Sequence, residues 1–230
     1  MDSEFIRHIP CESCGSSDAN SLYTDGHTYC FACETYGEKE VNEVFKEESV
    51  TDFLEGEYKA LGKRKLSQET CRFWDYQVGT TDNSKVHIAN HKNENGITVA
   101  QKLRFPNKSF SVKGDIKSAG LYGQWLWRDS GKMVTVVEGE LDALSLSQAF
   151  GNKWAVVSLR NGAAGAKRDI KASLEWLEKF ESGVFMFDND DVGKKAAVEC
   201  ANLLSPSKAK IAKLPLKDAS DMLQAGRVKE

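Results

Sequence analysis

The clearest pattern in the chain is an alternation of short apolar runs and amphipathic stretches that begins near residue 129. The runs MVTVV, AVVSL and VFMF, and a shorter one in KAKIAKL, are rich in β-branched and aromatic residues, which favours buried strands. Between them, LDALSLSQAF, AAGAKRDIKASLEWLEKF and VGKKAAVECANLL repeat apolar residues at helical spacing. Strands that alternate with helices predict an α/β domain with a mostly parallel sheet over residues 129–230.

Residues 57–128 have a different pattern, which predicts an α+β subdomain. KVHIANH and GITVAQKLRF have the character of strands and flank KNENG, a predicted turn, and NKSFSVKG predicts one more strand. SQETCRFW predicts the start of a helix with Ser67 as its N-cap. Trp125 and Trp127 flank Leu126 at alternating positions, and we expect them to lie in the core.

Four of the six cysteines form two C-x2-C pairs that are separated by 15 residues: Cys11, Cys14, Cys30 and Cys33. Four thiolates at this spacing suit one tetrahedral Zn²⁺. Two disulfides are the alternative, and they are less favoured because the chain shows no export signal. A module of this size buries little core, so the metal would supply its folding energy. We therefore expect a small β zinc ribbon over residues 1–36, followed by an acidic linker over residues 37–56.

Charge is distributed unevenly along the 230 residues, although the net charge is only −3. Residues 1–56 carry 3 Lys and Arg against 13 Asp and Glu, residues 57–128 carry 13 against 6, and residues 129–230 carry 15 of each. The basic middle segment, with Phe105 and Phe110 among its basic strands, favours contact with a phosphate backbone. An ordinary solvated sheet face is the alternative.

Composition disfavours disorder, export and membrane insertion. Hydrophobic residues make up 40% of the chain, which is enough for a packed core. No apolar run approaches the ~20 residues that span a bilayer. The N-terminal sequence MDSEFIRHIP lacks the basic and apolar regions of a secretory signal.

Acidic residues follow two of the predicted parallel strands. Glu138 and Glu140 come after MVTVV, and Asp188, Asp190 and Asp191 come after VFMF. Ligands bind at the carboxyl ends of strands in such sheets, so we expect these carboxylates to converge there. Converging carboxylates repel one another and need a cation, and their oxygens suit Mg²⁺ or Mn²⁺. The alternative is a set of acidic loops that cap the following helices, and for Glu140 alone the two interpretations are equally favoured.

These residues carry a resemblance to a known family. VVEGELD and MFDNDDVGKKA resemble the acidic motifs of the TOPRIM fold, which bacterial-type primases, topoisomerases and some nucleases share. CESCGSSDANSLYTDGHTYCFAC resembles the zinc ribbon of phage primase-helicases of the T-seven type. SQETC, QKLR, NKSF, VVSL and LPLKDA continue the resemblance in the same order, so that it covers nearly the whole chain apart from the linker.

The resemblance implies a template-directed DNA primase, a nucleotidyltransferase that makes short RNA primers during phage DNA replication. One or two Mg²⁺ or Mn²⁺ ions would assist the transfer of nucleotidyl groups. The matching positions are Glu138, Asp188 and Asp190 for the catalytic metal, Asp142 and Asp218 for further acidic positions near the site, and Lys102 and Lys108 for nucleotide or primer phosphates.

Template recognition is also implied by the resemblance. Asp25 and His27 match residues of the ribbon that help to read the template. The implied partners are single-stranded DNA, ribonucleoside triphosphates, a replicative helicase and a DNA polymerase. The implied location is the cytoplasm of a phage-infected bacterium.

The chain departs from the family pattern in two places. The linker after Cys33 is shorter than the usual one, and Arg160 and Asn161 stand in place of the usual Gly and His. It has no G-x4-G-K-[ST] motif and stops at Glu230, so we expect no NTP-driven movement along DNA by this chain alone. Two other functions stay open. A recombination mediator of the RecR type would bind DNA without nucleotidyl transfer, and a TOPRIM nuclease would use the same acids to cut.

Overall fold

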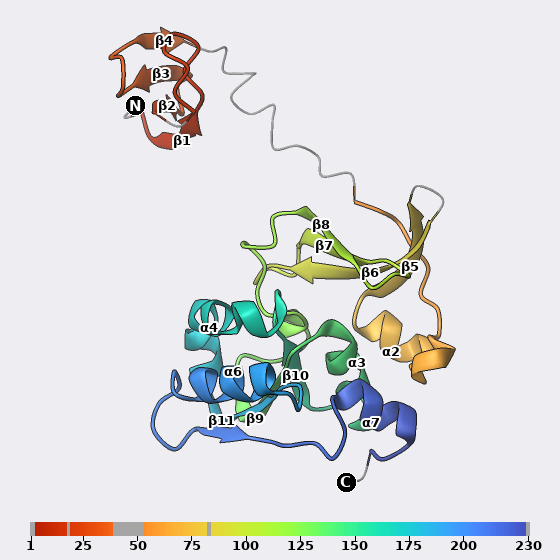
Figure 1. Cartoon of the computed structure of the whole chain (residues 1–230). Helices are drawn as coiled ribbons and strands as arrows, with labels where there is room; N and C mark the ends of the chain where they lie inside the picture. Colours follow the sequence, from red (N-terminus) through yellow and green to blue (C-terminus); the bar gives the residue numbers. More distant parts are fainter. Residues whose placement is uncertain (1–2, 18, 39–52, 82–83, 229–230) are drawn as a thin grey trace. The chain divides into compact units, whose positions relative to one another are not determined.

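The chain divides into two compact units, Met1–Asp52 and Phe53–Glu230 (Figure 1). The computed structural model describes residues 3–17, 19–38, 53–81 and 84–228. The expected linker over residues 37–56 overlaps folded chain at both ends. Gly37 and Glu38 belong to a strand, and the backbone N–H of Leu54 donates to Gln101 Oε1 at 2.8 Å. The rest of that linker, residues 39–52, lies outside the described residues.

The first unit is an antiparallel sheet in the order β1-β2-β3-β4. Its strands are β1 (Phe5–Ile9), β2 (Asn20–Tyr23), β3 (His27–Cys30) and β4 (Tyr36–Glu38). The β2–β3 hairpin turns at Gly26, whose φ of 90° lies in the left-handed region that glycine tolerates best. The predicted small β module is therefore confirmed.

The second unit begins with an antiparallel sheet in the order β5-β6-β7-β8. Its strands are β5 (Tyr76–Thr81), β6 (Ser84–Lys92), β7 (Thr98–Arg104) and β8 (Phe110–Gly114). Helix α2 (Gln68–Phe73) starts as predicted, because the Ser67 hydroxyl accepts a hydrogen bond from the Thr70 N–H at 3.1 Å. The sequence patterns did not identify β5 or the short 3-10 helices η1 (Gly62–Arg64) and η2 (Gln124–Leu126).

The second sheet of this unit is parallel, in the order β10-β9-β11-β12. Its strands are β9 (Gly131–Val137), β10 (Ala155–Ser158), β11 (Phe180–Met186) and β12 (Ala209–Ile211). The helices are α3 (Glu140–Ala149), α4 (Gly162–Ala172), α5 (Leu174–Glu178), α6 (Asp191–Ala201) and α7 (Ala219–Ala225). The predicted α/β domain is confirmed, although the long helix expected over residues 163–180 is broken at Ser173 into α4 and α5.

Helices cover the parallel sheet in two groups, with α3 beside α7 and α4 beside α6 (Figure 1). Val136, Phe185 and Ile170 belong to one buried cluster, with residues of α4 and α6. A second cluster joins α3 and α7 to the antiparallel sheet through Trp74 and Tyr122. The two sheets of the second unit therefore share a core.

Trp127, Cys71 and Cys200 pack into the core of the second unit. Trp127 packs against both clusters, and its Nε1–H donates to the Val156 carbonyl at 2.7 Å. Cys71 and Cys200 are fully buried. Burial raises the pKa of each thiol to about 11, so both are inert core residues. None of the helices in the described ranges is long and apolar enough to cross a membrane.

Candidate active site and metal centre

The two predicted acidic clusters emerge at the same edge of the parallel sheet. Val137, the last residue of β9, pairs in register with Met186, the last residue of β11. Glu138 and Asp188 therefore follow neighbouring strand ends within two residues of that pair. This is the edge at which open parallel sheets bind ligands, as the sequence predicted.

Glu138 has one oxygen anchored and one oxygen unpartnered. Its Oε1 accepts a hydrogen bond from the Ala163 N–H, in the first turn of α4, at 3.2 Å. Its Oε2 is buried and has no hydrogen-bond partner among the described residues. Burial, followed by the negative charges of Asp188 and Asp190, raises the pKa of Glu138. A buried carboxylate oxygen without a donor, close to like charges, is the environment that a bound cation stabilises.

Asp188 and Asp190 lie in the tight turn that leads from β11 into α6. Asp190 is the N-cap of α6, and its Oδ1 accepts from the Gly193 N–H at 2.8 Å. Only glycine fits at position 193, because a Cβ there would lie 2.3 Å from the Asp188 carbonyl oxygen. Asp188 Oδ2 lies 2.9 Å from the ammonium of Lys217. The expectation that Asp190 caps a helix and the expectation that it is near Glu138 and Asp188 are therefore both met.

Asp142 and Asp218 extend the acidic group onto α3 and α7. The Ser220 N–H donates to Asp142 Oδ1 at 3.0 Å, and Asp218 caps α7 by accepting from the Asp221 N–H at 2.7 Å. Burial and then the negative charge of Asp218 raise the pKa of Asp142 to about 8. The negative charges of Asp188 and Glu138 also raise the pKa of Asp142, so these four acids interact electrostatically.

The acids are neighbours but do not surround one point. Among the described residues, only the four cysteines bring three or more ligand atoms within 4.8 Å of one another. The physical reason is that like charges repel while separate partners hold the carboxylates apart: Ala163 for Glu138, Lys217 for Asp188 and Gly193 for Asp190. The all-oxygen donor set and the unpartnered Glu138 Oε2 fit a hard divalent cation.

Glu140 does not belong to this acidic group. Its Oε1 lies 2.8 Å from Lys102 Nζ and 3.4 Å from His91 Nε2, and the His91 side chain has no exposed surface. Burial alone would raise the pKa of Glu140, but the charge of Lys102 and the contact with His91 lower it to about 2. For this residue the metal interpretation is wrong, because a buried ion pair already uses its carboxylate.

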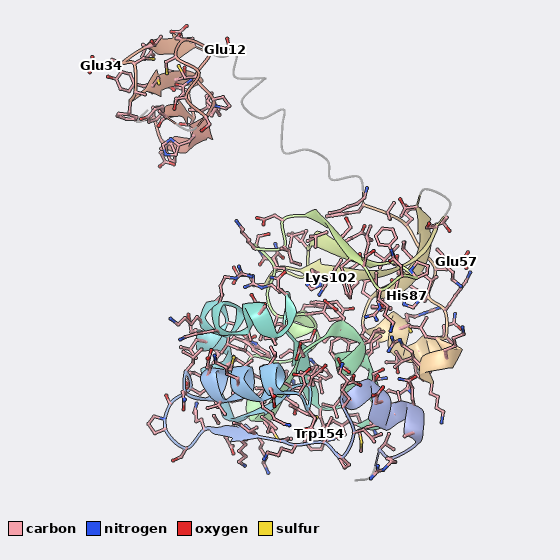
Figure 2. The ribbon with its side chains drawn as sticks, in the orientation of Figure 1. Glu12, Glu34, Glu57, His87, Lys102 and Trp154 are labelled. Atoms are coloured by element: carbon pink, nitrogen blue, oxygen red, sulfur yellow. The ribbon has the colours of Figure 1, made fainter. Side chains whose placement is uncertain are left out.

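Lys102 consequently sits at the junction of the two sheets rather than on an open surface (Figure 2). It comes from β7, and besides Glu140 it donates to the Arg160 carbonyl at 3.0 Å. Its Nζ and the Arg104 guanidinium each lie 5.2 Å from the Phe110 ring centroid. Lys108 is exposed in the β7–β8 turn, with a left-handed φ of 68°. The predicted interleaving of basic and aromatic side chains is therefore present on β7 and β8.

Arg160 is a structural residue that the sequence patterns did not identify. Its guanidinium bonds Asp169 Oδ1 through Nε at 3.2 Å and through Nη2 at 3.0 Å. Its Nη1 donates to the carbonyls of Lys117 and Ala119 at 2.9 and 2.8 Å. Arg160 and Asp169 are both buried. Arg160, which stands where the family usually has another residue, thus joins the end of β10 to helix α4 and to the segment that follows β8.

The four cysteines of the first unit form a site of metal-binding geometry. Their sulfurs all lie within 4.8 Å of one another, and the Cys11–Cys33 and Cys14–Cys30 Sγ–Sγ distances are both 3.7 Å. A disulfide needs about 2.05 Å, so the disulfide alternative is wrong. The Thr35 hydroxyl, 3.1 Å from Cys33 Sγ, lowers the pKa of Cys33 to about 6, whereas the contact with Cys33 raises the pKa of Cys14 to about 12.

Asp25 and His27 lie together at the β2–β3 turn of the same unit. His27 Nδ1 is 2.6 Å from Asp25 Oδ1, and the His27 N–H donates to the same oxygen at 3.1 Å. The His27 ring is stacked between Tyr23 and Tyr36, with centroid distances of 4.1 and 5.4 Å and interplanar angles of 11°. Tyr36 is 60% exposed, so the stack ends in an open aromatic ring that sequence reasoning missed.

Comparison with known proteins shows what the chain is similar to. Residues 56–114 match the family described as Bacteriophage T7 DNA helicase/primase, N-terminal a+b fold, and residues 135–223 match the Toprim-like family. The DNA helicase/primase of Enterobacteria phage T3 is 39% identical over 235 aligned positions, which cover 96% of this chain but 41% of that protein. The chain thus spans less than half the length of this relative.

Solved structures agree with this match. The primase fragment of the bacteriophage T7 primase-helicase is 37% identical with a TM-score of 0.74, and the alignment covers 97% of this chain and 96% of that one. A T7 structure of the lagging-strand polymerase with primase domains of two gp4 subunits is 38% identical with a TM-score of 0.73, covering 77% of this chain and 90% of that one. The DnaG primase catalytic domain bound to single-stranded DNA, 15% identical with a TM-score of 0.55, shares the fold. The chain belongs to the T7-type phage DNA helicase/primase family and corresponds to its primase fragment.

Proposed function

We propose that this chain is a DNA primase, which joins ribonucleotides on a single-stranded DNA template by metal-dependent nucleotidyl transfer. The observation that carries the proposal is the placement of Glu138 and Asp188 at one edge of a Toprim-like sheet, in a chain that aligns with nearly the whole T7 primase fragment. The T7 primase domains of one solved structure are bound to an RNA/DNA hybrid and dTTP, which supports the same class of substrates here.

Glu138, Asp188 and Asp190 are the residues that would hold one or two Mg²⁺ or Mn²⁺ ions. Asp142 and Asp218 are further acidic residues near this site. Such ions, when bound, lower the pKa of an attacking hydroxyl and stabilise charge on the transferred phosphoryl group. Glu138 would offer its unpartnered Oε2, and Asp190 would offer the oxygen that does not cap α6. The chain's task is to hold these oxygens in place while two nucleotides are positioned.

Lys102 and Lys108 would neutralise nucleotide or primer phosphates, Lys108 from the exposed β7–β8 turn and Lys102 from the junction of the two sheets. Lys108 is exposed and can reach a ligand directly. Lys102 is tied to Glu140, so its ammonium acts from a fixed position at the junction of the sheets. Fixed cations aimed at developing negative charge stabilise a transition state more than mobile ones do.

The first unit would bind one structural Zn²⁺ through Cys11, Cys14, Cys30 and Cys33 and would read the template. Asp25 and His27 offer an acceptor and a ring nitrogen for exposed base edges, and Tyr36 offers a ring face for stacking. A T7-type polymerase is one proposed protein partner, because the T7 structure holds its polymerase with primase domains. A replicative helicase is the other, because the T3 relative is a DNA helicase/primase. The proposed location is the cytoplasm of the infected bacterium.

The test incubates the full chain with Mg²⁺, labelled ribonucleoside triphosphates and single-stranded DNA of varied sequence. Short labelled RNA is expected, and Asp188→Asn should abolish it. Asp191→Asn is the matched control, because Asp191 is an exposed acid of the same turn. Shortened DNA would indicate the nuclease, and DNA binding without either product would indicate the mediator. Undiminished RNA synthesis by Asp188→Asn would overturn the assignment of the metal ligand.

A further inference from the structure

Lys217 places a positive charge inside the acidic group. Its Nζ lies 2.9 Å from Asp188 Oδ2 and 3.8 Å from Asp218 Oδ2. The carboxylate side chains of Asp188 and Asp218 are only 16% and 17% exposed, whereas the Lys217 side chain is 59% exposed. The ammonium therefore reaches from solvent into a partly buried group of acids and offsets part of their repulsion.

The backbone of Lys217 is held by hydrogen bonds, whereas its side chain is exposed and flexible. The Asn189 N–H donates to the Lys217 carbonyl at 2.7 Å, and Asn189 Nδ2 donates to the Leu214 carbonyl at 3.3 Å. These bonds tie the segment that contains Lys217 to the turn between β11 and α6. The position of the ammonium can therefore change only by rotation of a flexible four-carbon stem.

A divalent ion and the Lys217 ammonium compete for the same carboxylate. Mg²⁺ binds oxygen at about 2.0–2.1 Å, so an ion on Asp188 Oδ2 would lie within a few ångströms of the ammonium that now contacts this oxygen. At that separation two cations in a partly buried site repel each other strongly. This repulsion opposes simultaneous contact of both cations with Asp188 Oδ2, and the more exposed and flexible partner is the one that moves.

We propose that Lys217 is a resident counter-ion, which holds the Asp188 carboxylate in the metal-free protein and is displaced when a divalent ion binds. Metal binding is then an exchange of cations, and Lys217 weakens it. The inference rests on the proposed role of Asp188 as a metal ligand, but it requires no nucleotidyl transfer. Its test therefore measures metal binding alone, and its outcome is independent of whether the chain makes RNA.

The experiment measures binding of Mn²⁺ to the full chain, without nucleotide or DNA, by the electron paramagnetic resonance signal of free Mn²⁺. Lys217→Met should tighten the Mn²⁺ dissociation constant by about fivefold, since it removes both the competing pair and the repulsion. The matched control is Lys213→Met, which removes an equal charge from the same segment at an exposed lysine that lines the groove beside Asp188. The control should change the constant by less than about twofold, as expected for a charge without direct contact.

A second measurement uses the unmodified sequence and so does not depend on the variant folding. Carbon-13 signals of the lysine side chains are followed during titration with Mg²⁺. The Lys217 signal should move with the same midpoint as metal binding, while the Lys213 signal stays in place. The proposal would be overturned if Lys217→Met bound Mn²⁺ no more tightly than the unmodified protein does. It would also be overturned if the Lys217 signal did not shift at saturating Mg²⁺.

Discussion

Glu140→Gln is the substitution whose effect on stability can be worked out most directly from the structure. The change removes the charge from a carboxylate whose side chain is only 10% exposed and leaves Lys102, 15% exposed, without its ionic partner. The folded protein holds the pKa of Glu140 at about 2, against an ordinary value of 4.5. One pH unit between the two states corresponds to about 1.4 kcal/mol, so ionised Glu140 stabilises the fold by about 3 kcal/mol at neutral pH.

The sign of the pH dependence follows from the lowered pKa. The stabilisation is fully present above pH 4.5, where the unfolded chain also has Glu140 ionised, and is lost as the pH falls towards 2. The difference in unfolding free energy between the unmodified protein and Glu140→Gln should therefore be largest at neutral pH and shrink across this window.

Urea unfolding followed by tryptophan fluorescence is the appropriate assay. All five tryptophans lie in the second unit, so the signal reports this unit and not the cysteine-rich one. Lys102→Met and the double variant complete a cycle that isolates the pair from the separate effect of each substitution. The expected coupling free energy is at least 1 kcal/mol. Additive effects, or a loss below 1 kcal/mol for Glu140→Gln at pH 7, would refute the assignment of a stabilising ion pair.

Three other substitutions test separate parts of the structure. Cys30→Ser should release zinc, measured with a chelating dye, without changing the tryptophan-monitored unfolding midpoint; a full equivalent of retained zinc would contradict the four-cysteine site. Arg160→Leu should lower the unfolding free energy by about 3–5 kcal/mol, because it removes both guanidinium hydrogen bonds to Oδ1 of buried Asp169, and a loss below 1 kcal/mol would contradict that role. Asp142→Asn should stabilise the metal-free protein more at pH 9 than at pH 4, because the raised pKa of Asp142 destabilises the fold progressively as the pH rises from 3.8 to about 8, and this cost is constant above that. Equal effects of Asp142→Asn at both pH values would show that Asp142 titrates normally.

Local patterns were sufficient to predict the parallel sheet, the cysteine site and the edge at which Glu138 and Asp188 emerge. Each depends on short-range information: apolar runs, the C-x2-C spacing, or the fact that a residue directly follows a strand. The positions of Asp142 and Asp218 near the site came from the family resemblance, because nothing in their local sequence distinguishes them from ordinary residues of helix starts.

The partners of charged residues could not be predicted in the same way. Glu140 follows a strand in the same manner as Glu138, yet it pairs with Lys102, 38 positions earlier and on another sheet. Arg160 binds carbonyls more than 40 positions away, which carry no side-chain signal in the sequence. Lys217 is adjacent to Asp218 in sequence, but its closer contact is Asp188, in the turn that follows β11. Such contacts depend on the docking of the two sheets and on the turn that follows β11.

The most direct test of the catalytic proposal is to locate the metal. Crystals of the full chain grown or soaked with Mn²⁺ would be measured near the manganese absorption edge, and the anomalous difference map would be calculated. A peak is expected at the carboxyl edge of the parallel sheet, within about 2.5 Å of oxygens of Glu138 and of Asp188 or Asp190. A map in which Mn²⁺ is bound elsewhere while these carboxylates keep only their protein partners would contradict it.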